Sequence, residues 1–449
     1  MPLWAGAATR DISPDRPIAL FGYPHTHRVS RGVHDPILAS ALYVRADEGA
    51  VVCVALDILM LDSPAARSLR RAVAEAAGAE QARVFISCTH THSAPVTATI
   101  LGLQDDPTVP PPEAAYLRFI EAQTVAAAAE AVRTAAPAEL AWTTTDATGV
   151  GGNRREPGGP TDGECGILAV RLRQSGAMLA VSLIYGMHPT VLHEDSKLVS
   201  ADFVHYARLA IRDGLGTAAP VVYHTAPCGD QSPRHFVRSQ SFAEAERLGR
   251  MLGSRVVERL SALGEEAFEA DPPLAGALRE VRVSRRELPD VAEAEARLAD
   301  CRGEHRRLGR AGAPRGQVRT AECAVFGAEA TLTLARAQQS GRLVEAVSAC
   351  RPIEVQAVRI GKAVMVGLPG ELFAAYGLAI KSAAAATTFV VSLVNGELLG
   401  YVTTPEAMAA GGYEATNSVF GPEAGRAMVD AAVALTRELA PGGQPAEQK

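Results

Sequence analysis

The sequence lacks the features that mark several protein classes. Only 5% of its 449 residues are aromatic, and 44 Lys and Arg face 50 Asp and Glu, which gives a net charge of −6. Without a basic stripe the chain lacks the electrostatic footprint of a nucleic-acid-binding protein. It has no polybasic patch, no basic start followed by an apolar segment, and no run approaching about 18 apolar residues. We therefore predict a cytoplasmic protein without nucleic acid as a partner and without stable membrane association.

Cysteine usage excludes two further frameworks. The seven cysteines are odd in number, widely spaced, and contain no CxxC pair. This pattern argues against a disulfide scaffold and against a cysteine-based zinc finger. Most of these cysteines are expected to be small buried apolar residues.

What is present is an alternation of strand-like and helix-like segments. Apolar, β-branched runs cover residues 50–58, 83–88, 166–173 and 178–185. Helical periodicity covers residues 63–77, 112–135 and 242–263, with Asp62-Ser63-Pro64 and Gly78 as start and stop signals. This alternation predicts an α/β protein of layered, mixed sheets flanked by helices.

One segment differs in composition from the rest of the chain. Residues 288–342 are rich in Ala, Arg and Glu, are interrupted at Gly312-Ala313-Pro314, and predict a helical hairpin. This hairpin is either a solvent-exposed helical excursion, or it forms a lid or a dimer surface. A homo-oligomer is therefore possible. We predict one domain over residues 1–440 and a disordered tail over 441–449.

Histidines and a carboxylate suggest a metal site. His90 and His92 follow an apolar run, and residues at i and i+2 of a strand share a face. His188 follows another such run, while Glu371 lies just inside a helix-like start. Two imidazoles and a carboxylate with an open position form the ligand set of a catalytic zinc site. Spacing alone cannot join them, and the alternatives are solvated histidines in a turn and a carboxylate favoured by a helix dipole.

Seven ordered segments resemble the neutral/alkaline, non-lysosomal ceramidases, which are zinc amidases that split an N-acyl linkage. The segments, in chain order, are Gly32-Val33-His34-Asp35-Pro36, Thr89-His90-Thr91-His92-Ser93, Asn153-Arg154, His188-Pro189-Thr190, Gly229-Asp230-Gln231-Ser232-Pro233, Pro369-Gly370-Glu371, and Tyr401-Val402-Thr403-Thr404 with Tyr413-Glu414. They span most of the chain. The resemblance implies the catalytic domain of that family, in a short form without its C-terminal β-sandwich domain.

The resemblance also implies roles for individual residues. The implied zinc ligands are His90, His188, Glu371 and Tyr401. The residues implied to face the scissile group are His92, Arg154 and Tyr413. Ser232 matches a serine proposed as a nucleophile in the family, and we favour a substrate-binding role for it because no separate base is visible.

Departures from the family pattern bear on the substrate. Ala94-Pro95-Val96 replaces the usual glycines after the histidine core, and Cys228 and Arg234 stand where asparagines are usual. With few aromatic residues for work at a lipid surface, we predict a small soluble amide rather than ceramide.

The predicted function is zinc-dependent hydrolysis of an N-acyl or other linear amide by metal-activated water, with His92 as the general base. Two alternatives stay open. One is acyl transfer or lactam-forming cyclisation at the same zinc site, and the other is an inactive, zinc-stabilised binding protein.

Overall fold

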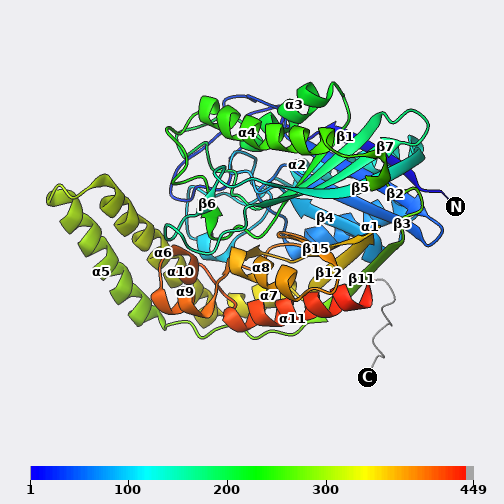
Figure 1. The fold of residues 1–449 in the computed structure, drawn as a ribbon. Helices are drawn as coiled ribbons and strands as arrows, with labels where there is room; N and C mark the ends of the chain where they lie inside the picture. Colours follow the sequence, from blue (N-terminus) through cyan, green and yellow to red (C-terminus); the bar gives the residue numbers. More distant parts are fainter. Residues whose placement is uncertain (1, 441–449) are drawn as a thin grey trace.

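Two sheets packed face to face form the centre of the molecule, with helices on both outer faces (Figure 1). The computed structural model describes residues 2–440, so the predicted tail 441–449 lies outside the described residues. This arrangement is the layered α/β fold with mixed sheets that the sequence predicts. Within residues 2–440, no helix has the length and apolar character needed to cross a membrane.

The larger sheet has eight strands, and they run both parallel and antiparallel. In spatial order they are β4 (Val84–Cys88), β3 (Gly49–Leu56), β2 (Leu38–Ala46), β1 (Trp4–Asp11), β5 (Ala136–Asp146), β7 (Glu164–Leu172), β8 (Met178–Tyr185) and β9 (Val221–Thr225). The two outermost pairs, β3 with β4 and β8 with β9, are parallel, and the pairs between them are antiparallel.

Strand β3 shows why these strands read as continuous apolar runs. Val52, Val54 and Leu56 belong to the core beneath the outer helices, whereas Val51 and Cys53 pack between the two sheets. Successive side chains of a strand point to opposite faces, and here both faces are buried. The continuous run therefore reflects a strand with no solvent-exposed face.

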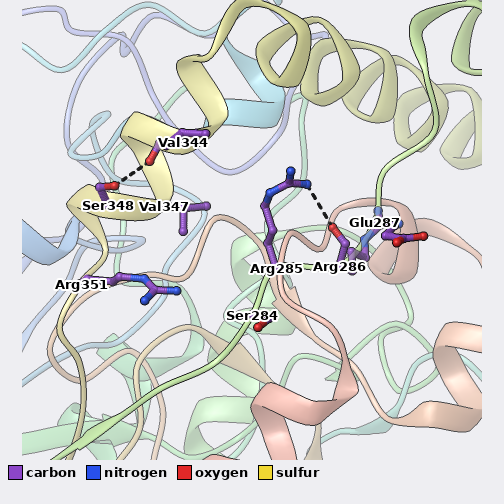
Figure 2. Close-up of a pocket in the computed structure, with 8 residues that line it drawn as sticks. All are labelled: Ser284, Arg285, Arg286, Glu287, Val344, Val347, Ser348 and Arg351. Atoms are coloured by element: carbon purple, nitrogen blue, oxygen red, sulfur yellow. Dashed lines mark hydrogen bonds between the residues drawn. The ribbon is translucent and has the colours of Figure 1, made fainter.

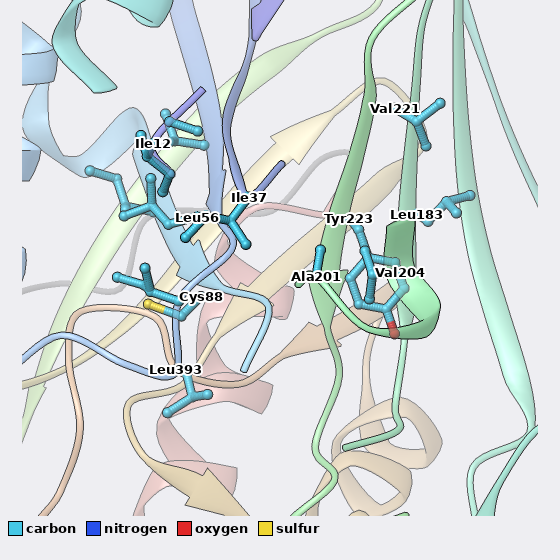
Figure 3. Packing of buried hydrophobic residues seen from close by; sticks show 14 of the residues in the cluster. Ile12, Ile37, Leu56, Cys88, Leu183, Ala201, Val204, Val221, Tyr223 and Leu393 are labelled. Carbon is cyan, nitrogen blue, oxygen red and sulfur yellow. The ribbon is translucent and has the colours of Figure 1, made fainter. Parts of the chain in front are cut away.

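Four helices cover the outer face of the larger sheet. They are α1 (Ser63–Ala77), α2 (Ala114–Arg133), α3 (Phe203–Leu215) and α4 (Phe242–Ser261). Helix α1 has the predicted bounds because Asp62 caps the Ala65 N–H and Gly78 takes the left-handed conformation at its end. Figure 3 shows part of the core beneath these helices, where Ile12, Ile37 and Leu56 pack together.

The smaller sheet has four strands and its own helical cover. Its strands, in spatial order, are β11 (Leu274–Val281), β12 (Ile353–Ile360), β13 (Ala363–Gly367) and β15 (Thr387–Val391). Its outer face packs against α7 (Arg342–Ala349), α8 (Ala374–Ala383) and α11 (Pro422–Glu438). Between the two sheets, Trp142 stacks on Phe389 with ring centroids 4.8 Å apart.

Short elements complete the body. Two ladders pair β6 (Gly152–Asn153) with β10 (Gln231–Ser232) and β14 (Glu371–Leu372) with β16 (Tyr401–Val402). Other short elements are the 3-10 helices η1 (Gln81–Arg83), η2 (Leu101–Leu103) and η3 (Glu265–Ala267) and the helices α9 (Pro405–Ala410) and α10 (Tyr413–Thr416). The β14–β16 ladder and α10 carry residues of the candidate site.

The predicted helical hairpin consists of α5 (Val291–Arg310) and α6 (Arg315–Ser340), and α5 projects from the body in Figure 1. The break falls at Gly312, which has a positive φ, followed by Ala313 and Pro314. The two helices share a small apolar core that includes Leu298, Val325 and Leu332. The inner helix α6 also packs against η2 and α10.

Candidate active site

Three histidines from separate parts of the chain meet at one place. His90 and His92 follow β4, and His188 follows β8. Their nearest ring nitrogens all lie within 4.8 Å of one another. His90 and His188 are buried, at 1% and 0% exposure. The fold thus brings together histidines almost one hundred residues apart.

Each of these imidazoles is held by a backbone carbonyl through its Nδ1. His90 Nδ1 donates to the Leu59 carbonyl at 2.9 Å, and His92 Nδ1 donates to the Gly22 carbonyl at 2.9 Å. His188 Nδ1 donates to the Cys228 carbonyl at 2.6 Å. A carbonyl oxygen can only accept, so in all three neutral rings the proton is on Nδ1 and the Nε2 lone pair is free.

The sequence-based expectation that His90 and His92 share one face of a strand is wrong. Strand β4 ends at Cys88, and His90 has a positive φ of 69° in the loop that follows. The His90 N–H still donates to the Ile58 carbonyl at 3.0 Å, which continues the pairing of β4 with β3. A left-handed turn, rather than strand alternation, therefore brings both rings to the same centre.

Glu371 and Tyr401 are neighbours in the two-residue parallel ladder of β14 and β16. The expected position of Glu371 inside a helix is wrong, because α8 begins three residues later at Ala374. The residue before Glu371 is Gly370, which has a positive φ of 80°. This turn starts the short strand and places the carboxylate beside the histidines.

The distances among these groups fit a metal ion. The Nε2 atoms of His90 and His188 lie 3.1 Å apart, and Glu371 Oε2 lies 3.2 Å and 3.3 Å from them. Two lone pairs and a carboxylate at this separation repel one another unless a cation is present. Ligands about 2.0 Å from a tetrahedral zinc ion are about 3.3 Å apart. Glu371 Oε2 and His92 Nε2 are also buried without a hydrogen-bond donor.

Burial shapes the protonation of the site. It lowers the pKa of His188 to about 4, and the nearby Arg154 guanidinium adds to this effect. Burial and the neighbouring His90 and His188 hold the pKa of His92 well below its usual range. Burial also favours neutral Glu371, but positive charge on the facing histidines, which a bound cation would replace, outweighs it and holds the pKa of Glu371 well below the usual value. Neutral imidazoles beside a carboxylate anion are the forms that bind metal.

Arg154 connects Tyr401 to an acidic partner. Its NH2 group donates to the Tyr401 hydroxyl at 3.1 Å, and its Nε donates to Glu414 Oε1 at 3.0 Å. The other oxygen of Glu414 accepts from Arg155 at 2.6 Å. Burial lowers the pKa of Arg154, but Tyr401 and Glu414 outweigh it and raise that pKa well above its ordinary value. A permanent positive charge thus sits next to the Tyr401 hydroxyl.

A small cavity of about 60 Å³ opens beside the histidines. Predicted site residues that line it are His90, His92, Glu371, Tyr401 and Tyr413. The other lining residues are Phe21, Gly22, Pro24, Leu59, Met60, Ile100, Leu103, Gly400 and Asn417.

Ser232 has a different position from these residues. It is buried on β10, and its hydroxyl accepts from the Arg234 N–H at 3.2 Å. Ser232 is not among the described residues that line the cavity. Its role stays a prediction.

Several residues of the site escape sequence reasoning. Gly22 orients His92 through its carbonyl, so any residue type could supply the same acceptor. Arg28 is 1% exposed and donates to the carbonyls of Phe21 and His92 at 2.9 Å. Nothing in the sequence around Arg28 marks it. Glu414 could have been found, since it adjoins Tyr413 in the last of the seven segments.

A much larger recess of about 580 Å³ lies elsewhere on the surface (Figure 2). Arg285, Arg286 and Arg351 line it, together with Val344 and Val347. Among the residues described, none of the predicted site residues lines this groove. The chemistry of the site therefore belongs to the smaller, buried cavity.

Residues 4–235 match the model of the neutral/alkaline non-lysosomal ceramidase N-terminal domain. The chain belongs to this family. The match extends over more than half of its length and includes the three histidines. Membership implies amide hydrolysis and agrees with the resemblance found in the sequence motifs. No protein of curated function matches the sequence.

Solved structures agree on the fold of this ceramidase-family chain. The crystal structure of neutral ceramidase from Pseudomonas aeruginosa is similar with a TM-score of 0.73 at 17% identity, covering 98% of this chain and 75% of that one. A structure described as ceramidase complexed with C2 also gives 0.73 at 17% identity, covering 100% and 77%. These likenesses confirm the layered α/β fold.

Proposed function

We propose that this chain is a zinc-dependent amidohydrolase that cleaves an N-acyl or other linear amide of a small molecule. The zinc ligands in this proposal are His90, His188, Glu371 and Tyr401. One observation carries it: two imidazole lone pairs and a buried carboxylate face one another at 3.1 to 3.3 Å. Such a set is stable only around a cation, and nitrogen and oxygen ligands of this kind suit zinc.

When bound, zinc supplies Lewis acidity, which polarises an amide carbonyl and makes water more acidic at neutral pH. Tyr401 is the least usual ligand. Burial and the Glu371 carboxylate raise the pKa of its phenol well above the ordinary value. The Arg154 guanidinium on its hydroxyl opposes that effect and favours the anionic oxygen that a metal ion binds.

His92 is the proposed general base. Its Nδ1–H is fixed on the Gly22 carbonyl, so Nε2 is the atom that takes a proton. Nε2 removes a proton from the attacking water as the new C–O bond forms. The same proton then passes to the amide nitrogen as the C–N bond breaks, which releases an acid and an amine. The lowered pKa of His92 keeps its ring unprotonated at neutral pH, which is the form that a general base needs.

Tyr413 and Arg154 are the proposed stabilisers of the carbonyl oxygen as it gains charge. Burial keeps the Tyr413 phenol protonated by raising its pKa, so it can donate a hydrogen bond. A donor of this kind contributes typically about 3 kcal/mol to the transition state. For Ser232 we keep the substrate-binding role that its family motif suggests.

Metal analysis together with activity tests the proposal. We expect close to one zinc per chain in protein purified without chelators, with hydrolysis of N-acyl amines lost on chelation and restored by zinc. His188→Ala should lose both zinc and activity. His193→Ala is the matched control, since His193 contacts Tyr23 but does not line the cavity. Full activity without metal, or normal zinc in His188→Ala, contradicts the proposal.

The same assay separates the alternatives. An acyl transferase should form product only when an amine acceptor is added. A cyclase should convert a substrate that carries its own amine into a lactam without any added acceptor. A binding protein would hold zinc without converting any amide.

A further inference from the structure

The apolar lining of the cavity includes Phe21, Leu59 and Met60 as well as Pro24, Ile100 and Leu103. We call the last three residues the apolar wall. These residues come from two loops that are distant in sequence. The wall and the histidines line one cavity of about 60 Å³, far below the 300–1,000 Å³ typical of ligand pockets. Whatever part of a substrate lies against the wall must be small, unless the wall moves.

Helix α6 of the hairpin lies directly behind the wall. A Cβ at Gly102, between Ile100 and Leu103, would lie 3.5 Å from the Ala330 Cβ of α6. Next to Pro24, the His25 ring stacks on Phe326 of α6 with centroids 4.3 Å apart. Both loops of the apolar wall are therefore packed against the same helix.

Polar contacts add to this packing. His25 Nδ1 lies 3.4 Å from Glu329 Oε2, and the Thr333 hydroxyl of α6 donates to Asp105 at 3.2 Å. Asp105 is two residues beyond Leu103, so α6 contacts η2 at Gly102 and the chain just after it at Asp105. The wall cannot retreat without breaking these contacts.

The same helix also supports another part of the cavity lining through α10, which carries Tyr413. A Cβ at Gly327 of α6 would come within 2.2 Å of the Thr416 hydroxyl. The Thr331 hydroxyl donates to the Thr416 carbonyl at 3.4 Å. At Gly327 the helix approaches too closely to accept any side chain, so α6 sets the distance between the wall and Tyr413.

The lining is also poor in charge. Of the described residues that form the cavity, Glu371 is the single carboxylate, and none is Lys, Arg or Asp. An ionised substrate group against the wall would lose its hydration without gaining a partner, which costs several kcal/mol. The wall therefore selects an uncharged, apolar group.

We infer that α6 fixes the apolar wall as a size filter, so that the enzyme takes amides with a short, uncharged acyl chain and rejects long-chain ones. This inference rests on the proposed function, because it assigns the acyl chain of the scissile amide to the wall. It makes Ile100 and Leu103 specificity-determining residues and gives the hairpin a role in substrate selection.

A chain-length series on the zinc-loaded, full-length enzyme tests the filter. The substrates are p-nitroanilides with acetyl, butanoyl, hexanoyl, octanoyl and dodecanoyl groups, compared by kcat/KM. We expect wild type to prefer the two shortest. Leu103→Ala and Ile100→Ala should raise the octanoyl-to-acetyl ratio by about 10- to 100-fold, the range seen when hydrophobic pockets gain room for methylenes.

Leu263→Ala is the matched control, since Leu263 is half-buried on the core beneath the outer helices and does not line the cavity. Its ratio should stay at the wild-type value. Equal hydrolysis of dodecanoyl and acetyl substrates by wild type overturns the inference, as does an unchanged ratio in folded, zinc-loaded Leu103→Ala.

A series of binding measurements tests the size filter independently of catalysis. The probes are the straight-chain carboxylic acids from acetate to dodecanoate, each tested for its effect on the Tm of zinc-loaded wild type and Leu103→Ala. The filter predicts that only short acids stabilise wild type, while octanoate also stabilises the variant. If no amide is cleaved by any zinc-loaded protein, the proposed function fails, and this series alone decides the filter. Stabilisation of wild type by dodecanoate contradicts it.

Discussion

The two sides of the cavity are held in place by different forces. On the histidine side, backbone carbonyls fix each imidazole, and the Glu371 strand pairs with the Tyr401 strand. On the apolar wall, packing against α6 does the same work, with few hydrogen bonds. Hydrogen bonds fix direction, which chemistry needs, whereas packing fixes distance, which size selection needs. Substitutions on the histidine side should therefore affect rate, and those on the wall should affect substrate choice.

The largest effect is expected for His92 on the histidine side. His92→Ala should keep zinc and lose about 10²- to 10⁴-fold in kcat, because a general base contributes that much. His90→Ala should lose zinc as well as activity, because it removes a ligand. Metal content and kcat of both variants check this.

The opposite pattern would reverse the assignment of these two residues. His92 Nε2 is close enough to its neighbours for the three histidines to form a ligand set. If His92→Ala lost its zinc while His90→Ala kept it, His92 would be the ligand and another group the base.

A smaller effect is expected for Arg154, which reaches the Tyr401 hydroxyl. Arg154→Met should lower kcat by about 10²- to 10³-fold, the usual cost of one donor to a developing oxyanion. Arg155→Met is the control, since Arg155 shares Glu414 but not Tyr401. Equal loss in both variants would show that only the pairing of Glu414 matters.

The sheet beneath the histidines should show a pH-dependent stability. His224 on β9 is fully buried, its Nδ1 lies 2.7 Å from the Ser87 hydroxyl, and burial lowers its pKa to about 3. As pH falls below the unfolded value near 6.5, only the unfolded chain takes up this proton, so stability is lost toward pH 3. The loss should reach roughly 3 kcal/mol by about pH 4.

Urea unfolding at several pH values measures this slope. His224→Gln should reduce this slope, since His188 and His92 still contribute, whereas His235→Gln, at an exposed residue, should leave it unchanged. A His224→Gln slope equal to wild type would show that other groups cause the acid sensitivity.

The smallest effect is expected behind the wall. Phe326→Leu removes the aromatic partner of His25, and such pairs contribute about 0.5–1.5 kcal/mol. For the longest acyl chain that the enzyme accepts, kcat/KM relative to the acetyl substrate should rise about two- to tenfold in this variant. Its zinc content should be unchanged. Phe119→Leu, on the exposed face of α2, is the control. A fall in zinc or in acetyl turnover in Phe326→Leu would mean that α6 also supports the histidine side.

The sequence alone determined the local elements and the family to which the chain belongs. Helix α1 and strand β8 have the predicted bounds, because a cap, a stop glycine and an apolar run are local signals. The α5–α6 hairpin was likewise predictable from its break at Gly312. The ordered motifs identified the family before any distance was known.

Only the tertiary structure decided how those residues meet. Glu371 was expected in a helix and lies in a two-residue strand, because its partner at Tyr401 is thirty residues away and no local pattern encodes that pairing. His90 reaches the other histidines through a left-handed turn, which the local sequence does not predict because His90 is not a glycine. The apolar wall depends on α6, whose contacts with Gly102 and Thr416 cross more than eighty residues of chain. Motifs record which groups a reaction needs, whereas the distances between them arise from packing of segments that are remote in sequence.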